Sequence, residues 1–287
     1  MMTRSTAGWP RSMSACRMRR ARESSAASSK PTSVSTLSSI SGPPGLHRGA
    51  HRQQDNTVAR CKLSRHFGRR ALGENPASYH SARPGYPEWV FATLSSVCGL
   101  RQDAAIFEIG AGTGTATRRL LELGANPLIA IEPDPCLGEF LRTNIPDEAL
   151  RVVVAPFENV SLDPGAFDLE VCATAFHWLD EGPALVKIGR LLRPGAWWAE
   201  VWNVFADDSQ PDRFHEATKN LLLTRTSPSA GERGIPFGLD SVARLAALKR
   251  IGAFDFAENK TSRWSLLFGN RVVQNITTSL YIARRAG

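Results

Sequence analysis

The 287-residue sequence lacks several features that would each define a class of protein. Its five cysteines are widely spaced, so no C-x-x-C pair is present to hold zinc or to act as a redox dithiol. No apolar run approaches the roughly 18–20 residues that a membrane helix needs, and no metal-ligand cluster is visible. We therefore expect no metal and no membrane association. Cys98 and Cys172 lie in apolar runs and are predicted to be buried, which fits a reducing, cytoplasmic setting.

Acidic residues are nearly absent from the first 70 residues, which carry 14 Lys and Arg but only two Asp and Glu. Residues 71–287 carry 21 basic and 25 acidic side chains, so their net charge is −4, although the whole chain carries +8. The basic excess thus belongs to the N-terminal part. A mildly acidic surface repels a phosphate backbone, so we expect no nucleic-acid partner for the folded part.

Large apolar residues are also scarce in 1–65, where Ser and Arg dominate, and this composition predicts a disordered extension. An Arg-rich, Ser-rich and acid-poor stretch is equally typical of an organelle transit peptide, so import is the alternative to a cytoplasmic location. An unselected upstream extension fits the same composition. We expect one domain over 66–287, with a cofactor-binding core at about 100–203 and C-terminal helices and closing strands at 204–287.

Short apolar runs alternate with helical stretches in the presumptive domain. The sequence predicts strands at 104–109, 128–131, 151–155, 167–173 and 196–203, and helices at 88–97, 114–123, 135–143, 181–192, 211–223 and 239–251. Strands that alternate with helices at this spacing form βαβ units around a parallel sheet, so the fold class is α/β. The segment 253–283 is rich in residues that favour strands, with Gly269-Asn270 as a candidate turn.

The strongest local signal is a buried strand that runs into three alternating glycines, Gly110, Gly112 and Gly114, and then into a helix. Glycine is needed where the backbone turns sharply and a ligand approaches without a Cβ in the way. The helix that follows offers free N–H donors and partial positive charge at its amino terminus. This arrangement predicts a nucleotide-binding turn.

Two kinds of nucleotide suit such a turn. The dinucleotide pattern G-x-G-x-x-G/A needs Gly or Ala at position 115, where this chain has Thr115. The alternative pattern, E-x-G-x-G-x-G, is matched throughout, with Glu108 two residues before the first glycine. A carboxylate there would repel a pyrophosphate but attract a ligand that bears an ammonium and a sulfonium.

This pattern resembles the first motif of the class I S-adenosylmethionine-dependent methyltransferases. Three segments further along the chain resemble later motifs of the same family. They are Ile131-Glu132-Pro133, Pro156-Phe157-Glu158 and Leu191–Ala196, the last of which resembles "LRPGG". The segment Tyr79–Pro87 resembles the "YxxxRPGYP" lead-in of small-molecule methyltransferases with a type 11 domain. The resemblance spans about 75–203. It implies a Rossmann-like, doubly wound, mostly parallel sheet with an antiparallel last strand, and S-adenosyl-L-methionine as cofactor.

The resemblance also implies roles for individual residues. Glu132 would bind the ribose hydroxyls, a position that dehydrogenases use in the same way. Glu158 would accept a hydrogen bond from the adenine amine while Phe157 flanks the ring, although an exposed loop acid after a strand is the alternative. The remaining predicted cofactor residues are Glu108, Gly110, Ala111, Gly112, Gly114, Pro133 and Ala173.

A sulfonium methyl is already a strong electrophile, so alignment of donor and acceptor can contribute about 7–11 kcal/mol without further groups. An oxygen or protonated nitrogen acceptor still benefits from a base. His177, just past the fourth strand, is the candidate; a histidine packed beside Trp178 with no proton to move is the alternative. Tyr79, Arg83, Trp178 and Trp202 are candidates for the acceptor pocket, and Arg83 is suited to a carboxylate of substrate or cofactor.

The absence of certain motifs narrows the range of possible methyl acceptors. No N-P-P-Y or D-P-P-Y follows the fourth strand, where enzymes that methylate nucleobase or glutamine amines carry it. Cys136 follows the second strand, at the wrong end of the site for a nucleophile, and is interpreted as an early helix residue. We expect methyl transfer to a small molecule by a monomer or homodimer. The alternatives are a catalytically silent methyltransferase-like module and a nicotinamide-dependent oxidoreductase.

The end of the chain allows two predictions. The full family sheet has seven strands, of which the last two form an antiparallel hairpin, and only 253–283 is left to supply it. In one interpretation 277–285 is the final strand. In the other, 268–281 is a helix, and the closing strand is missing.

Overall fold

The computed structural model describes residues 61–62, 72–205, 207–222, 225–226, 228–231, 234–268 and 271–287. The chain divides into two compact units, Met1–Ala59 and Arg60–Gly287, and every described residue belongs to the second. Apart from 61–62, the predicted extension 1–65 lies outside the described residues, and so does the expected boundary at residues 65 and 66.

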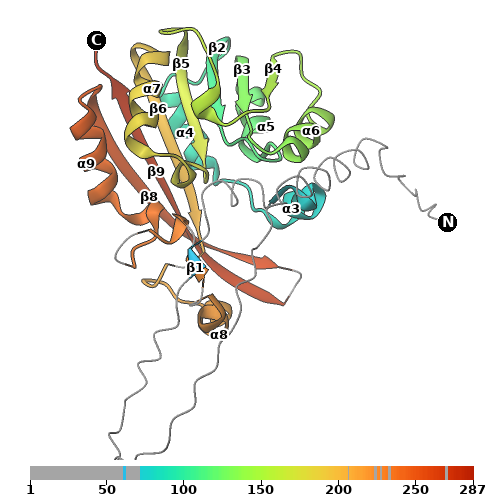
Figure 1. The fold of residues 1–287 in the computed structure, drawn as a ribbon. Coiled ribbons are helices and arrows are strands. Elements are labelled where there is room, and N and C mark those ends of the chain that lie inside the picture. The colour runs from blue at the N-terminus through green and yellow to red at the C-terminus, as the bar shows by residue number, and fades with distance from the viewer. Residues whose placement is uncertain are drawn as a thin grey trace, which may run out of the picture. The chain divides into compact units, whose positions relative to one another are not determined.

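A seven-stranded sheet organises the second unit (Figure 1). Its strand order is β4-β3-β2-β5-β6-β9-β8; the first five strands are parallel, and β9 is antiparallel to both of its neighbours. The predicted α/β class and the antiparallel last strand are therefore confirmed. The strands are β2 (Ala104–Ile109), β3 (Ala125–Ile131), β4 (Leu150–Val153), β5 (Phe167–Ala173), β6 (Leu192–Val204), β8 (Phe254–Phe268) and β9 (Val272–Arg285). Two further short strands, β1 (Cys61–Lys62) and β7 (Arg225–Thr226), pair in parallel as a separate sheet.

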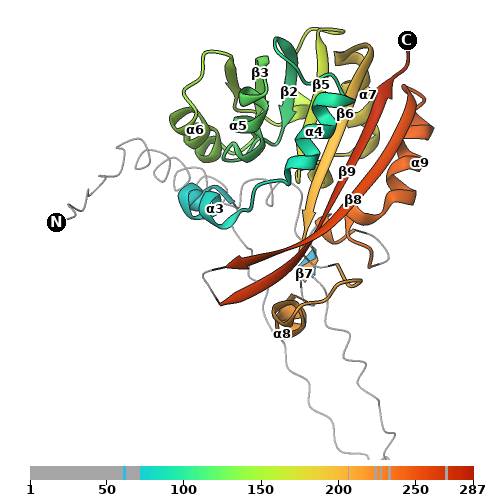
Figure 2. The ribbon, with the colours of Figure 1, turned by 180° about the vertical axis from the view of Figure 1, so that it is seen from behind.

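Helices cover both faces of the large sheet, as the opposite views in Figures 1 and 2 show. Helices α4, α5 and α6 lie on one face, and α7 and α9 lie on the other. No helix in the described part of the chain combines the length and the apolar character needed to cross a membrane. The helices are α3 (Pro76–Ala82), α4 (Glu88–Ser96), α5 (Thr115–Glu122), α6 (Pro135–Asn144), α7 (Glu181–Leu191), α8 (Arg213–Leu222) and α9 (Ser241–Ile251).

Strand β2 illustrates why this sequence forms a central parallel strand. All six of its residues are buried, because helices cover both faces and strands flank both edges. Ile106 belongs to the same buried apolar cluster as Leu94 of α4 on one face, and Phe107 belongs to the same cluster as Ile188 of α7 on the other. Burial of each such side chain stabilises the fold by about 1.5–3 kcal/mol. The core therefore fixes the position at which β2 ends and the glycine turn begins.

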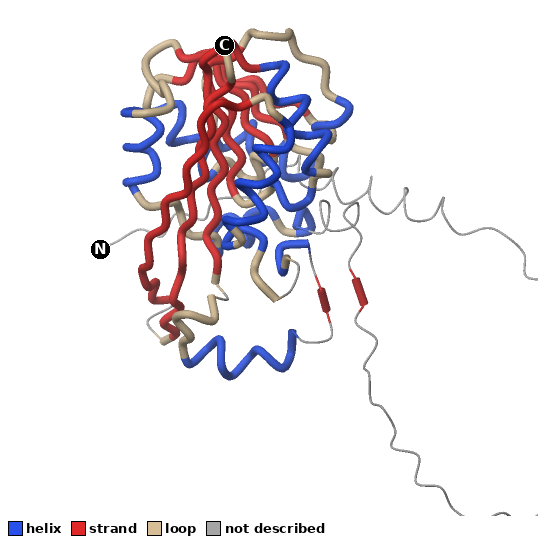
Figure 3. Tube along the Cα trace, turned by 90° about the vertical axis from the view of Figure 1, so that its left-hand side faces the viewer, coloured by secondary structure: helices blue, strands red, loops and turns tan. Residues whose placement is uncertain are grey.

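The C-terminal hairpin decides between the two predictions for the end of the chain. Strands β8 and β9 pair from Phe254–Arg285 to Phe268–Val272, so the helix predicted over 268–281 is wrong and the sheet has its closing strand. Thr277, Thr278 and Tyr281 favour an extended chain, and β6 and β8 flank them on both sides. The candidate turn Gly269-Asn270 lies outside the described residues. Figure 3 shows that β8 and β9 extend beyond the other strands.

Most predicted elements are present with shifted ends, and one helix was missed. Helix α6 begins at Pro135, so Cys136 is an early helix residue as predicted, and Cys98 and Cys172 are buried free thiols. Helix α3 was not predicted because it spans seven residues, none of them buried, and so shows no apolar period. Asn75 caps it, with its side-chain oxygen accepting a hydrogen bond from the Ser78 N–H at 3.0 Å.

Candidate active site

The three alternating glycines form the turn between β2 and α5, and each has a positive φ, of 72°, 60° and 87° in chain order. A Cβ at Gly110 would lie 2.3 Å from Cβ of Ala175, and one at Gly114 would lie 2.4 Å from Cδ1 of Leu141. At Gly112 the nearest atom would be 3.9 Å away. The outer two glycines therefore allow close packing, whereas a Cβ at Gly112 would make only ordinary van der Waals contacts, with Tyr79 and the Gly110 carbonyl oxygen.

Glu132, directly after β3, holds the glycine turn in place. Its Oε2 accepts a hydrogen bond from the Gly112 N–H at 2.8 Å, and its Oε1 accepts one from the Asp134 N–H at 2.8 Å. Burial raises the pKa of Glu132 to about 7, although both N–H groups lower it. Asp134 in turn caps α6 by accepting a hydrogen bond from the Cys136 N–H at 2.8 Å. Each oxygen of Glu132 keeps a second lone pair for a further donor.

Glu108 is the second buried carboxyl at this end of the sheet. Its side chain lies at the end of β2, and its Oε2 accepts a hydrogen bond from the Thr117 hydroxyl of α5 at 2.6 Å. Burial raises its pKa to about 7, and the bond from Thr117 opposes that rise. A cation placed beside Glu108 would favour the ionised carboxylate, so this site is suited to a positively charged group.

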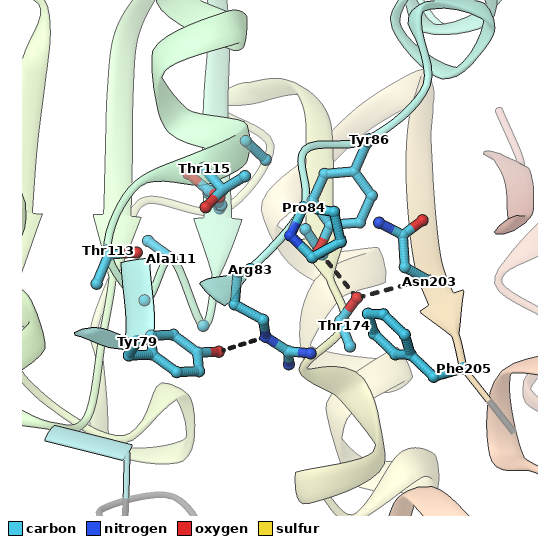
Figure 4. A pocket seen from close by; sticks show the side chains of 15 residues that line it. Tyr79, Arg83, Pro84, Tyr86, Ala111, Thr113, Thr115, Thr174, Asn203 and Phe205 are labelled. Atoms are coloured by element: carbon cyan, nitrogen blue, oxygen red, sulfur yellow. Dashed lines mark hydrogen bonds between the residues drawn. The ribbon is translucent and has the colours of Figure 1, made fainter. Parts of the chain in front are cut away.

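A pocket lies between the glycine turn, the segment that connects α3 to α4, and the ends of β5 and β6 (Figure 4). The turn and α5 contribute one wall, the connecting segment a second and the strand ends a third. The lining residues are Glu108, Gly110, Ala111, Gly112, Thr113, Thr115 and Ala116; Tyr79, Arg83, Pro84 and Tyr86; and Ala173, Thr174, Asn203 and Phe205.

Two hydrogen bonds tie the connecting segment to the strand ends. The Tyr86 hydroxyl bonds the Thr174 hydroxyl at 2.8 Å, and Asn203 Nδ2 donates to the Gly85 carbonyl at 3.1 Å. Thr174 has a φ of 57°, which is rare for a β-branched residue and is typical of a functional constraint. Burial raises the pKa of Tyr86 above its usual range, so its hydroxyl acts as a neutral hydrogen-bonding group.

His177 lies in the core and does not line the pocket. It is 5% exposed, and its Nδ1 accepts a hydrogen bond from the Trp202 indole N–H at 3.2 Å. Burial lowers the pKa of His177 to about 3, so the ring is neutral near pH 7 and is a weak base. This arrangement favours the packed histidine over the predicted catalytic base. Trp202 is buried as well, and Trp178 is half-buried on the turn that carries His177.

The predicted adenine-binding residues lie on a short turn after β4. The Phe157 ring is 2% exposed and packs nearly parallel to Phe107, with centroids 6.2 Å apart, whereas Glu158 is exposed. Lys187 of α7 holds this turn by donating hydrogen bonds to the carbonyls of Phe157, Glu158 and Val160 at 2.6, 3.1 and 2.6 Å. Burial lowers the pKa of Lys187. The ammonium group of Lys187 therefore fixes the position of this turn.

The structure brings some of the predicted residues together and separates others. The pocket contains Tyr79, Arg83, Glu108, Gly110, Ala111, Gly112 and Ala173. It does not contain Gly114, Glu132, Pro133, Phe157, Glu158, His177, Trp178 or Trp202. Among the residues that were missed, Tyr86 belongs to the quoted lead-in motif and Thr174 directly follows Ala173. Strand alternation puts Asn203 on the face of β6 opposite its buried neighbour Trp202, but no local signal indicates that this face reaches the pocket.

The strand order, the antiparallel last strand and the acid-flanked glycine turn define a class I methyltransferase fold. The family described as "Methyltransferase domain" matches residues 107–199. An uncharacterized methyltransferase of Geobacillus sp. (strain WCH70) is 31% identical over 190 residues, which cover 62% of this chain and 83% of that protein. The chain belongs to the class I S-adenosylmethionine-dependent methyltransferases with a type 11 domain.

Two further comparisons show the extent of the likeness. An uncharacterized methyltransferase of Mycobacterium tuberculosis (strain ATCC 25618 / H37Rv) is 33% identical over 147 residues, which cover 51% of this chain and 56% of that relative. The chain thus spans only about half the length of this relative. A solved phosphoethanolamine N-methyltransferase 2 of Haemonchus contortus, in complex with S-adenosylhomocysteine, superposes with a TM-score of 0.51 at 11% identity. The superposition covers 71% of this chain and 54% of the Haemonchus contortus chain, and it supports the fold alone.

Proposed function

We propose that this chain binds S-adenosylmethionine in the pocket at the glycine turn and transfers its methyl group to a small-molecule acceptor. The observation that carries the proposal is the position of Glu108, a buried carboxyl that lines the pocket together with Gly112. A sulfonium nucleoside brings positive charge to this carboxyl and is attracted. A dinucleotide would bring a diphosphate and be repelled, which disfavours the oxidoreductase alternative.

Two other acids support the same proposal. Glu132 is oriented by two backbone N–H groups and retains lone pairs for the two ribose hydroxyls. Glu158 lies on the turn held by Lys187, where its carboxylate can accept a hydrogen bond from an amine. Phe157 supports that turn from within the core. In this arrangement each acid binds a different part of the nucleoside.

When bound, S-adenosylmethionine supplies an electrophilic methyl group, so the residues of this chain mainly need to align the acceptor and exclude water. Thr174, Asn203 and Phe205 form the pocket wall at the ends of β5 and β6 and would orient the acceptor. Neither His177, with its low pKa, nor Tyr86, with its raised pKa, is suited to remove a proton near pH 7. The site is therefore best suited to an acceptor that attacks in its unprotonated form.

Isothermal titration with S-adenosylmethionine, S-adenosylhomocysteine and NAD tests the cofactor. We expect both sulfur nucleosides to bind and NAD not to bind; the reverse result would overturn the proposal. Glu108→Ala should weaken S-adenosylmethionine more than S-adenosylhomocysteine, because both ligands carry an α-ammonium but only S-adenosylmethionine also carries the positive sulfonium. Glu122→Ala, which removes an exposed carboxylate from α5 away from the pocket, serves as the matched control.

Transfer of a radiolabelled methyl group into a small-molecule metabolite extract tests the reaction. Labelled products of low mass support an enzyme with a small acceptor. Binding of S-adenosylmethionine without any transfer would instead support the catalytically silent module.

A further inference from the structure

A hydrogen-bond network of four residues joins the C-terminal hairpin to the pocket. The indole N–H of Trp264 on β8 donates to the Thr278 hydroxyl of β9 at 2.8 Å, and that hydroxyl donates to Oδ1 of Asn203 on β6 at 2.7 Å. Nδ2 of Asn203 then donates to the Gly85 carbonyl at 3.1 Å. The network therefore crosses three strands and ends on the segment that connects α3 to α4.

Strand register brings the three side chains of the network together. Thr278 lies directly opposite Asn203 where β9 pairs with β6, and Ser262 lies opposite Thr278 where β9 pairs with β8. Trp264 is two residues further along β8, so it is a diagonal neighbour of Thr278 on the same face of the sheet. Thr278 is fully buried and Asn203 is 7% exposed. Because little water reaches these two groups, the bond between them is stronger than it would be at the surface.

The chemistry of its two ends fixes the direction of every bond in the network. An indole N–H can only donate, and a backbone carbonyl can only accept. The Thr278 oxygen therefore receives the indole proton and directs its own proton to Oδ1 of Asn203, which leaves Nδ2 to face Gly85. A flipped Asn203 amide would place its oxygen against the Gly85 carbonyl oxygen, and the two acceptors would repel each other. Bonds that all run in one direction also polarise and strengthen one another.

The segment at the end of the network supplies part of the pocket wall. Pro84 and Tyr86 line the pocket on either side of Gly85, and Figure 4 shows Asn203 close to Tyr86 at the edge of the pocket. Apart from its chain neighbours, no atom lies within 4 Å of the position that a Cβ on Gly85 would occupy. Side-chain packing thus does not hold this residue, and the bond from Asn203 to its carbonyl fixes the backbone there.

We propose that Thr278 and Trp264 are positioning residues of the S-adenosylmethionine site, because through Asn203 they hold the segment at Gly85 and so fix the wall against which the nucleoside binds. Neither Thr278 nor Trp264 is among the described residues that line the pocket. The proposal rests on the proposed function. It gives the C-terminal hairpin a role in ligand binding in addition to closing the sheet.

Isothermal titration of S-adenosylmethionine into Thr278→Val tests the proposal, at a temperature where every variant is folded. Valine keeps the shape of the side chain but leaves Oδ1 of Asn203 without its donor, so the affinity should fall about tenfold. Thr278→Ser keeps the hydroxyl and should bind within about twofold of the wild-type protein. Ser279→Ala is the matched control: it removes a fully buried hydroxyl that bonds Asn259 at 2.9 Å on the other face of β9, and it should keep the wild-type affinity.

Hydrogen exchange tests the same network without a ligand. In Thr278→Val the peptide that contains residues 83–90 should exchange faster than in the wild-type protein, because the backbone at Gly85 is no longer held. Ser279→Ala should leave exchange in this peptide unchanged. Equal exchange in Thr278→Val and in the wild-type protein would overturn the positioning role.

Two further variants test whether the residues act through one another. In an Asn203→Ala background, Thr278→Val should cause no additional loss of affinity, because the group through which it acts is already absent. Full additivity of the two losses would overturn the proposal. Trp264→Phe removes only the first donor and leaves Thr278 able to donate to Asn203, so it should weaken S-adenosylmethionine by a smaller factor than Thr278→Val does. A larger loss in Trp264→Phe would contradict this order.

The outcomes of the titration separate the two proposals. If the wild-type protein does not bind S-adenosylmethionine, the proposed function fails and this inference fails with it. If the wild-type protein and Thr278→Val bind equally well, the function stands and the positioning role is overturned. A loss that Ser279→Ala shares, or that Thr278→Ser does not rescue, would also overturn it, since such a loss indicates a general effect on packing.

Discussion

The indole N–H of Trp202 donates a hydrogen bond to Nδ1 of His177, and both side chains are buried. His177→Leu would leave this indole donor without a partner, which costs about 1–3 kcal/mol. We expect the free energy of unfolding in urea to fall by that amount while methyl transfer changes less than tenfold. Trp202→Phe removes the donor instead and serves as the matched control. A hundredfold loss of transfer with unchanged stability would restore His177 as a catalytic base.

The stability of the ligand-free protein should depend on pH through Glu108. Its folded pKa of about 7 lies above its ordinary value of 4.5, so the folded state holds a proton that the unfolded state releases between these values. The stabilising contribution of Glu108 to the free energy of unfolding is complete below about pH 4.5. It is lost as the pH rises toward 7, with a slope of about 1.4 kcal/mol per pH unit.

Glu108→Gln keeps a neutral, isosteric group, so it should match the wild-type protein near pH 4.5 and exceed it in stability at pH 8. Urea unfolding at both values measures the difference. Glu122→Gln, at an exposed position on α5, should show no such gain. The prediction fails if the two Gln variants behave alike at pH 8.

Alanine substitutions at different glycines of the turn should have different effects on stability and on nucleoside binding. Gly112→Ala meets no atom within 3.9 Å, so it should lose only the roughly 1–2 kcal/mol that a left-handed alanine costs. Because Gly112 lines the pocket, its added methyl group should still weaken nucleoside binding strongly.

Gly114→Ala is the matched comparison, and it drives a methyl group into Leu141 and Ile145. We expect a larger loss of thermal stability than for Gly112→Ala. Melting temperature and titration of each variant test the contrast. Equal stability losses would show that the turn rearranges to accept either methyl group.

Lys187 should control the turn that carries Glu158. Lys187→Met removes three hydrogen bonds to backbone carbonyls, and hydrogen exchange at 157–160 should become faster. Affinity for S-adenosylmethionine should fall about tenfold, because Glu158, which we propose accepts a hydrogen bond from the adenine amine, is no longer positioned. Lys249→Met on α9 changes an exposed lysine and should alter neither measurement. Faster exchange without any loss of affinity would remove Glu158 from the site.

The features predicted from the sequence are those set by nearby residues. The turn from Glu108 to Gly114 was predictable because one strand, three glycines and one helix occupy about 20 consecutive residues. Asn203 was not, because its place in the pocket depends on pairing between β6 and β9 and on a carbonyl 118 residues away. The burial of His177 likewise depends on Trp202 and Phe237, which approach it only in the folded chain. The left-handed conformation of Thr174 has no local sequence signal at all.

The position of β9 between β6 and β8 has a consequence for biosynthesis. Among the strands that the structure describes, β8 pairs in the large sheet only with β9, and β6 pairs only with β5 on its other side. Until β9 leaves the ribosome, two strand edges stay open and can pair with the edges of other nascent chains. A premature stop shortly before Val272 would therefore yield a product prone to aggregate, even though all the described residues that line the pocket at the glycine turn had already been made.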